Sequence, residues 1–150
     1  MKPFPSGTRL KFLLADDDED DRILFGQALQ EVDREAILET VHNGRDLMRK
    51  LRSSTSSLPD MVLLDLNMPG MTGLQCLEEI RSDEAFEHVP VLMYSTTSEM
   101  TAVQASYKLG ANYYLRKPAD FEGLTAAIRK LLTIDNASIQ PPKEKFVIYY

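Results

Sequence analysis

The stretch KFLLADDDEDDRILF, residues 11–25, runs from apolar residues into six consecutive acids and then back into apolar sequence. A short, nearly continuous apolar run is typical of a strand that is covered on both faces of a parallel sheet. Acidic side chains stabilise the positive N-terminus of a helix, and we assign residues 18–21 to that role. The stretch therefore predicts a buried strand, a turn that carries Asp16 and Asp17, and a helix.

The same alternation of apolar runs and helical spacing continues to residue 133. Short apolar runs that alternate with amphipathic segments are typical of βαβ units, in which the strands are parallel. The sequence therefore predicts an α/β fold with a doubly wound parallel sheet. The predicted strands are residues 10–15, 36–41, 60–65, 91–95 and 113–117.

The clearest predicted helix follows the last of these strands. Its apolar residues recur at spacings of three and four, which is the pattern of a helix with one face on a sheet. Asp120 stands before the first of them as a candidate N-cap. The apolar face is expected to consist of Phe121, Leu124, Ile128 and Leu131.

The composition limits the class of protein. A chain of 150 residues is long enough for one domain with a core, and no apolar run approaches the roughly 18 residues that span a bilayer. The N-terminus lacks a secretion signal and the single Cys76 cannot form an internal disulfide, so we expect a cytoplasmic protein with no membrane partner. The net charge of -6 and the lack of a dense basic run argue against nucleic-acid binding.

The two ends differ from the rest of the chain. We expect a loose arm over residues 1–9, the folded domain over residues 10–133 and a tail over residues 134–150. Pro141 and Pro142 break any helix in the tail, which ends in the β-prone block FVIYY. This block is expected to dock on its own domain; a dimer contact, an added strand and a remnant of an expression vector are the alternatives.

Side chains that can bind a metal ion or take part in a reaction stand at the ends of four predicted strands. Asp16 and Asp17 follow the first strand, Asp65 ends the third, Ser95 ends the fourth and Lys117 ends the fifth. Ligands of an open parallel α/β sheet bind outside the carboxyl ends of its strands. The sequence thus brings three carboxylates, a hydroxyl and an ammonium to one edge of the sheet.

Converging carboxylates raise one another's pKa and destabilise the fold unless a cation lies among them. Oxygen ligands without paired His or Cys residues indicate a hard ion, and Mg²⁺ needs only one or two protein carboxylates. Mg²⁺ together with a lysine and a hydroxyl is suited to hold a phosphoryl group. Phosphoryl chemistry on an aspartate is therefore our first hypothesis.

The motifs LLADDD, LLDLNMPGMTG, VLMYST and YYLRKP, in this order, resemble the receiver domain of two-component response regulators. The resemblance covers residues 10–133 and implies a flavodoxin-like (βα)5 fold with strand order 2-1-3-4-5. It implies that Asp65 is the phosphoacceptor of a histidine kinase and that Asp16 and Asp17 place Mg²⁺. It also implies that the backbone carbonyl of Asn67 completes the metal ligands.

The resemblance assigns roles to three further residues. Ser95 matches the hydroxyl residue that binds the phosphoryl oxygen, and Lys117 matches the lysine that pairs with it. Tyr114 matches the aromatic switch residue, which turns inward when the hydroxyl residue moves toward the phosphate. A cis peptide bond between Lys117 and Pro118 is implied as well.

These observations predict a single-domain response regulator and not an enzyme with a substrate of its own. Phosphorylation would change the face formed by residues 98–117 and so alter the binding of a downstream protein or of a histidine phosphotransfer protein. No output domain is visible after residue 133. A homodimer through this face is a hypothesis, and there is a narrower resemblance to receivers that partner phytochrome-type kinases.

Two alternatives stay open. One is a Mg²⁺-dependent phosphohydrolase that forms its aspartyl phosphate on Asp16, with Asp18 as the second acid two positions on; turnover of small phosphate esters would support it. The other is a receiver-like interaction module that is no longer phosphorylated. The intact set of Asp65, Ser95 and Lys117 argues against the second alternative.

Overall fold

The computed structural model describes residues 9–53, 57–134 and 139–150. Most of the predicted arm, residues 1–8, lies outside the described residues. Five parallel strands form one sheet in the order β2-β1-β3-β4-β5, as predicted. The strands are β1 (Lys11–Ala15), β2 (Ile37–Val41), β3 (Met61–Leu64), β4 (Val91–Ser95) and β5 (Tyr113–Arg116).

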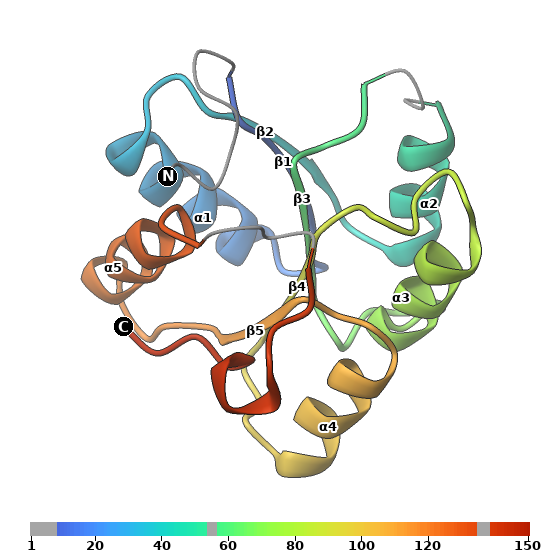
Figure 1. The fold of residues 1–150 in the computed structure, drawn as a ribbon. Coiled ribbons are helices and arrows are strands. Elements are labelled where there is room, and N and C mark those ends of the chain that lie inside the picture. The colour runs from blue at the N-terminus through green and yellow to red at the C-terminus, as the bar shows by residue number, and fades with distance from the viewer. Residues whose placement is uncertain (1–8, 54–56, 135–138) are drawn as a thin grey trace.

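Helices cover both faces of this sheet. Figure 1 shows α1 and α5 together on one side and α2, α3 and α4 on the other. The helices are α1 (Glu19–Val32), α2 (Gly44–Ser53), α3 (Gly73–Ser82), α4 (Met100–Lys108) and α5 (Phe121–Leu131), followed by the 3-10 turn η1 (Lys143–Lys145). No helix among the described residues has both the length and the apolarity to cross a bilayer.

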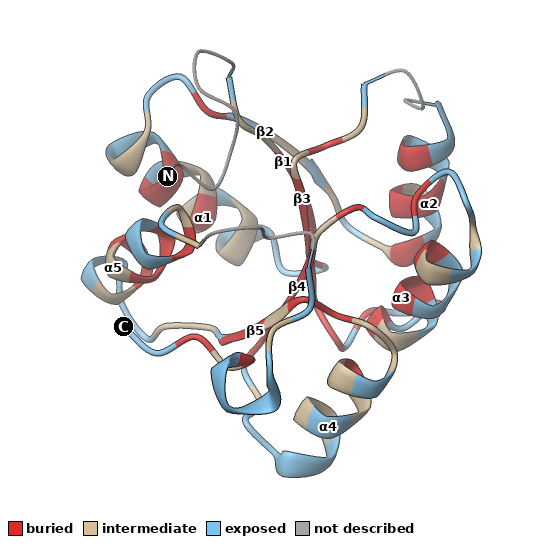
Figure 2. Ribbon diagram, viewed as in Figure 1, coloured by how far each residue is buried: buried red, intermediate tan, exposed pale blue. Residues whose placement is uncertain are grey.

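The core lies in two layers because successive side chains of a strand point to opposite faces. Leu13 of β1 packs in the layer under α2, α3 and α4, while Phe12 and Leu14 pack in the layer under α1 and α5. Every residue of β3 is buried, whereas β2 at the edge is only partly covered (Figure 2). The nearly continuous apolar runs of the sequence therefore mark strands that are covered on both sides.

The last helix follows the predicted pattern except at its first residue. The Asp120 carboxylate accepts a hydrogen bond from the backbone N–H of Gly123 at 2.7 Å and caps α5. Leu124 and Ile128 are buried, but Phe121 is 39% exposed, so its assignment to the core face is wrong. Side chains tilt toward the N-terminus of a helix, and Phe121 is the first residue of α5, so no earlier turn of this helix lies beneath it.

The C-terminal tail docks on its own domain, as expected. Val147 forms a parallel bridge with Tyr114 of β5, and Phe146 and Ile148 are buried. No peptide bond among the described residues is cis, so the implied cis bond between Lys117 and Pro118 is wrong for this structure. The trans form is the lower-energy isomer of an X–Pro bond by about 0.5–1 kcal/mol.

Candidate functional site at the carboxyl edge of the sheet

Backbone hydrogen bonds fix the strand ends that carry the predicted site. The N–H of Asp65, directly after β3, donates to the carbonyl of Ala15 in β1 at 3.0 Å. The N–H of Lys117, directly after β5, donates to the carbonyl of Ser95 at 2.7 Å. Sheet pairing therefore extends to the residues that carry the chemistry, and it holds their side chains at one edge.

The ammonium of Lys117 is the centre of the site. Its Nζ lies 2.8 Å from Oδ2 of Asp16 and 3.3 Å from Oδ2 of Asp65. It also donates to Oδ2 of Asp21 at 2.8 Å and lies 5.4 Å from the centre of the Tyr94 ring. Three carboxylates from three segments of the chain thus share one cation.

Asp21 is the member that the sequence did not predict. We assigned it only to the helix N-terminus, and it does lie in the first turn of α1, where its N–H donates to the Asp18 carboxylate at 3.0 Å. Its own carboxylate nevertheless turns to Lys117, which is 96 residues away in the sequence. No local signal identifies such a partner; only the fold brings α1 and the end of β5 together.

Asp16 is completely buried, and its two oxygens have different environments. Oδ1 accepts a hydrogen bond from the N–H of Asp18 at 3.0 Å. The contact of Oδ2 with Lys117 lacks hydrogen-bonding geometry, so this buried oxygen has no hydrogen-bond donor among the described residues. The charge on this oxygen faces only the Lys117 ammonium, which Asp21 and Asp65 share, so a second cation would stabilise it further.

The charge state of the site follows from its burial. Burial raises the pKa of Asp65 from its ordinary value of 3.8 to about 6, opposed by Lys117 and reinforced by Asp16. For Lys117, burial disfavours the charged form, but Asp16 and Asp21 outweigh it and hold the pKa above its ordinary value. The site at neutral pH is therefore one ammonium among more negative charge than it can neutralise.

The donor set fits a hard divalent cation. Asp16, Asp17 and Asp65 each offer a carboxylate oxygen, and these oxygens lie within 4.8 Å of one another. Such a group of oxygens, with water to complete the shell, suits Mg²⁺. The fourth predicted ligand, Asn67, lies at the same edge, where its N–H donates to Oδ1 of Asp65 at 3.3 Å; the role of its carbonyl stays a prediction.

Ser95 and Tyr114 extend the site toward α4. Ser95 is fully buried, and its Oγ accepts a hydrogen bond from the N–H of Thr97 at 3.3 Å. The ring of Tyr114 is also buried, and its hydroxyl donates to the carbonyl of Thr97 at 2.7 Å. The two predicted switch residues are therefore joined through one residue of the loop between β4 and α4.

Two glycines shape the loop after Asp65. Gly70 has φ of +78°, a left-handed conformation that glycine adopts without strain. A Cβ on Gly73 would lie 2.1 Å from the carbonyl oxygen of Asp65. The start of α3 can therefore approach the end of β3 only because residue 73 has no side chain.

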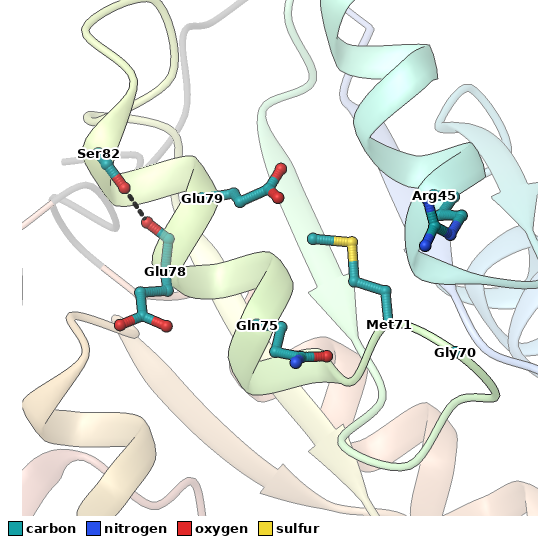
Figure 3. A pocket seen from close by; sticks show the side chains of 7 residues that line it. All are labelled: Arg45, Gly70, Met71, Gln75, Glu78, Glu79 and Ser82. Carbon is teal, nitrogen blue, oxygen red and sulfur yellow. Dashed lines mark hydrogen bonds between the residues drawn. The ribbon is translucent and has the colours of Figure 1, made fainter.

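A groove between α2 and α3 is separate from this site. It has a volume of about 450 Å³, and Figure 3 shows Arg45 of α2 on one wall and Gln75 and Glu79 of α3 on the other. Neither the Lys117 ammonium nor any of its carboxylate partners lines it. We therefore place the chemistry at the edge of the sheet and not in this groove.

Comparison with known proteins decides the family. Residues 12–129 match the family model of the response regulator receiver domain. The chain belongs to this family. It is 31% identical over 109 residues to the chemotaxis protein CheY1 of Helicobacter pylori, an alignment that covers 73% of this chain and 86% of that protein.

Solved receiver structures have the same fold. The phosphorylated cyanobacterial phytochrome response regulator RcpA superposes with a TM-score of 0.76 at 31% identity, over 83% of this chain and 91% of that one. The Mn²⁺-bound form of response regulator Rcp1 superposes with a TM-score of 0.74 at 27% identity, over 82% of this chain and 94% of that one. The chain is thus a two-component receiver domain with a flavodoxin-like fold, and its acidic cluster is a candidate Mg²⁺ site of the kind that receiver domains use.

Proposed function

We propose that this receiver accepts a phosphoryl group on Asp65 from a phosphohistidine of a sensor kinase, in a Mg²⁺-dependent reaction. The observation that carries the proposal is the position of the Lys117 ammonium, 3.3 Å from the Asp65 carboxylate and inside a cluster of acids. A cation held there by Asp16 and Asp21 is placed to balance the charge of a transferring phosphoryl group.

In the proposed step, an oxygen of Asp65 attacks the phosphorus, the P–N bond to the kinase imidazole breaks, and the imidazole leaves with the electron pair of that bond. Both partners are anionic, so the reaction depends on charge neutralisation and positioning. Lys117 supplies one positive charge, and the N–H of Asn67 orients Oδ1 of Asp65. Mg²⁺ bound by Asp16, Asp17, Asp65 and the carbonyl of Asn67 would neutralise further charge.

The proposed response begins at Ser95. Its hydroxyl donates to an oxygen of the new phosphoryl group, while its Oγ still accepts from the N–H of Thr97. Because Tyr114 is bonded to the carbonyl of the same residue, this change reaches the face formed by residues 98–117. A downstream protein, a histidine phosphotransfer protein or a second copy of this chain would read that face.

The names of the similar structures suggest the first partners to test. RcpA is described as a phosphorylated phytochrome response regulator, and Rcp1 was obtained with Mn²⁺, a divalent ion that accepts the same oxygen ligands. Phytochrome-type sensor kinases are therefore the first class of kinase to assay. We expect regulation of a partner and no turnover of a separate substrate.

The position of Asp18 disfavours the phosphohydrolase alternative. That alternative needs Asp18 as an acid beside an Asp16 nucleophile, but the Asp18 carboxylate caps α1 by accepting from the N–H of Asp21. Asp16 is completely buried against Lys117. Mg²⁺-dependent release of phosphate from small phosphate esters would support the phosphohydrolase alternative.

The test is the intact mass of the protein after incubation with acetyl phosphate and Mg²⁺. We expect a gain of one phosphoryl group that disappears when EDTA replaces Mg²⁺ and in the Asp65→Asn variant. Asp60→Asn is the matched control, because Asp60 lies at the other end of β3, where its carboxylate accepts from the N–H of Lys11. A wild-type protein that gains no mass while another receiver does would contradict the proposal.

A further inference from the structure

The C-terminal tail contacts one part of the face formed by residues 98–117, which would report phosphorylation: the end of α4 and strand β5. Tyr107 of α4 donates its hydroxyl to the carbonyl of Pro141 at 2.9 Å. The side-chain amide of Gln140 donates to the carbonyls of Tyr107 and Ala111 at 2.7 and 2.8 Å. These contacts hold the first part of the tail across the end of α4 and the segment that leads into β5.

The tail then binds both backbone groups of Tyr114. The N–H of Tyr114 donates to the carbonyl of Phe146 at 3.0 Å, and the N–H of Ile148 donates to the carbonyl of Tyr114 at 2.9 Å. Strand β5 lies at the edge of the sheet, so these backbone groups have no further strand of the sheet beside them. The tail therefore pairs with the edge strand at Tyr114, which is one of the two candidate switch residues.

The side chain of Phe146 completes this contact. It is 2% exposed, and its ring centre lies 5.1 Å from that of Tyr107 in an edge-to-face arrangement and 6.3 Å from that of Tyr114. Aromatic pairs at such distances contribute beyond the burial of their area. Phe146 thus packs against the Tyr114 ring in the layer under α2, α3 and α4.

The other end of the Tyr114 side chain leads to the phosphorylation site. Its hydroxyl donates to the carbonyl of Thr97, and the N–H of Thr97 donates to the Ser95 hydroxyl. Tyr114 is therefore held between the tail at its backbone and ring and the loop after β4 at its hydroxyl. Any coupling that these contacts carry acts in both directions, because coupling between two sites is reciprocal.

We propose that the tail, residues 139–148, is an intramolecular ligand of the α4–β5 face and that its docking strengthens phosphoryl binding at Asp65 by holding Tyr114 and the loop after β4 in place. This inference rests on the proposed function. Docking fixes Tyr114 before the phosphoryl group arrives, so less ordering remains to be done when Ser95 binds it. By reciprocity, the phosphorylated protein holds its tail more tightly.

The test measures the equilibrium affinity for beryllofluoride, a non-covalent mimic of the phosphoryl group, in the presence of Mg²⁺. Phe146→Ala removes the ring that packs on Tyr114, and Tyr149→Ala is the matched control because Tyr149 is 75% exposed. We expect about fivefold weaker binding for Phe146→Ala, within the usual range of coupling between sites, and no change for Tyr149→Ala. Should Phe146→Ala fail to fold, Phe146→Leu keeps the apolar volume and is expected to weaken binding in the same direction.

Hydrogen exchange supplies an independent readout. In the wild-type protein, beryllofluoride should slow the exchange of the N–H of Ile148, which is bonded to the carbonyl of Tyr114. Equal or tighter beryllofluoride binding by Phe146→Ala, or unchanged exchange at Ile148, would overturn this inference and leave the proposed function intact. A wild-type protein that neither binds beryllofluoride nor gains mass from acetyl phosphate would overturn both.

Discussion

At the scale of single residues, Lys117 offsets the negative charge of three acids that would otherwise destabilise the folded protein. Its ammonium contacts Asp16, Asp21 and Asp65, and its side chain is only 9% exposed. Without it, Asp16 and Asp65 would be buried carboxylates beside one another. The removal of one partner from a buried ion pair is much more costly than the absence of both partners.

We therefore expect Lys117→Met to lower the free energy of unfolding by about 3 kcal/mol in metal-free buffer, since it leaves buried charge without a partner. Lys130→Met on the exposed side of α5 is the control and should change stability by less than about 0.5 kcal/mol. Urea denaturation of both variants at pH 7 measures the difference. Similar urea midpoints for the two variants would mean that the contacts of Lys117 do not stabilise the buried carboxylates.

The stability of the metal-free protein should also depend on pH through Asp65. Its pKa is about 6 in the folded state and near 3.8 in the unfolded state, so the folded state binds the proton more tightly. Stability should fall as the pH rises from about 4 to about 6, and Asp65 should account for at most about 3 kcal/mol of that fall. Asp65→Asn should be more stable than wild type at pH 7 and less sensitive over this interval, as measured by urea denaturation at each pH.

At the same scale, the sequence predicted that residues at the strand ends meet at one edge of the sheet, and their chemical roles stay predictions. Asp16, Asp65, Ser95 and Lys117 could be found because the carboxyl end of a parallel strand fixes where its next side chain lies. Asp21 could not, because its role depends on the packing of a helix against a strand end that is 96 residues away. The rules for helix caps explain why its backbone N–H donates to Asp18, but they do not explain why its carboxylate points to Lys117.

At the scale of elements, the contact between α3 and β3 depends on Gly73. A Cβ there would lie 2.1 Å from the carbonyl oxygen of Asp65, and backbone cannot yield as a flexible side chain can. We expect Gly73→Ala to destabilise the fold by about 2 kcal/mol or more.

Gly26→Ala in α1 is the matched control for this prediction. Its Cβ would meet only the end of the Leu38 side chain at 3.6 Å, and alanine is favoured over glycine inside a helix by about 0.5–1 kcal/mol. Thermal unfolding should therefore give a melting temperature below that of wild type for Gly73→Ala and above it for Gly26→Ala. A Gly73→Ala protein as stable as wild type would contradict the close approach of α3 to β3.

Element positions were predictable where two signals agree. The strand bounds differ from the predicted ones by at most one residue, since apolar runs and polar strand ends mark the same limits. Phe121 shows where one signal fails: spacing alone placed it on the core face of α5, but the helix begins at that residue. The docking site of the tail was not predictable either, because no local pattern says that Phe146 packs against Tyr107 and Tyr114.

At the scale of the whole molecule, the sheet edge gathers negative charge that a bound cation would stabilise. A ligand that binds only the folded state raises stability with its concentration. We expect Mg²⁺ to raise the melting temperature of wild type in a saturable way, and Asp17→Asn to need much more Mg²⁺ for the same increase. Asp20→Asn, an exposed acid of the first turn of α1, is the control.

An equal response of wild type and Asp17→Asn to Mg²⁺ would mean that the ion stabilises the protein through its general negative charge and not at this cluster. The comparison also bears on the proposed function, because these acids would bind the metal ion that neutralises charge on the phosphoryl group. It also separates metal binding from phosphorylation, since no phosphodonor is present.

The most direct test of the account is to locate the phosphoryl group on the chain. After incubation with acetyl phosphate and Mg²⁺, reduction with borohydride converts an aspartyl phosphate to homoserine, which peptide mass spectrometry assigns to one position. The account predicts homoserine at residue 65 alone, in the peptide that contains Leu64 and Asn67. Homoserine at residue 16, or at no position while another receiver is labelled, would contradict it.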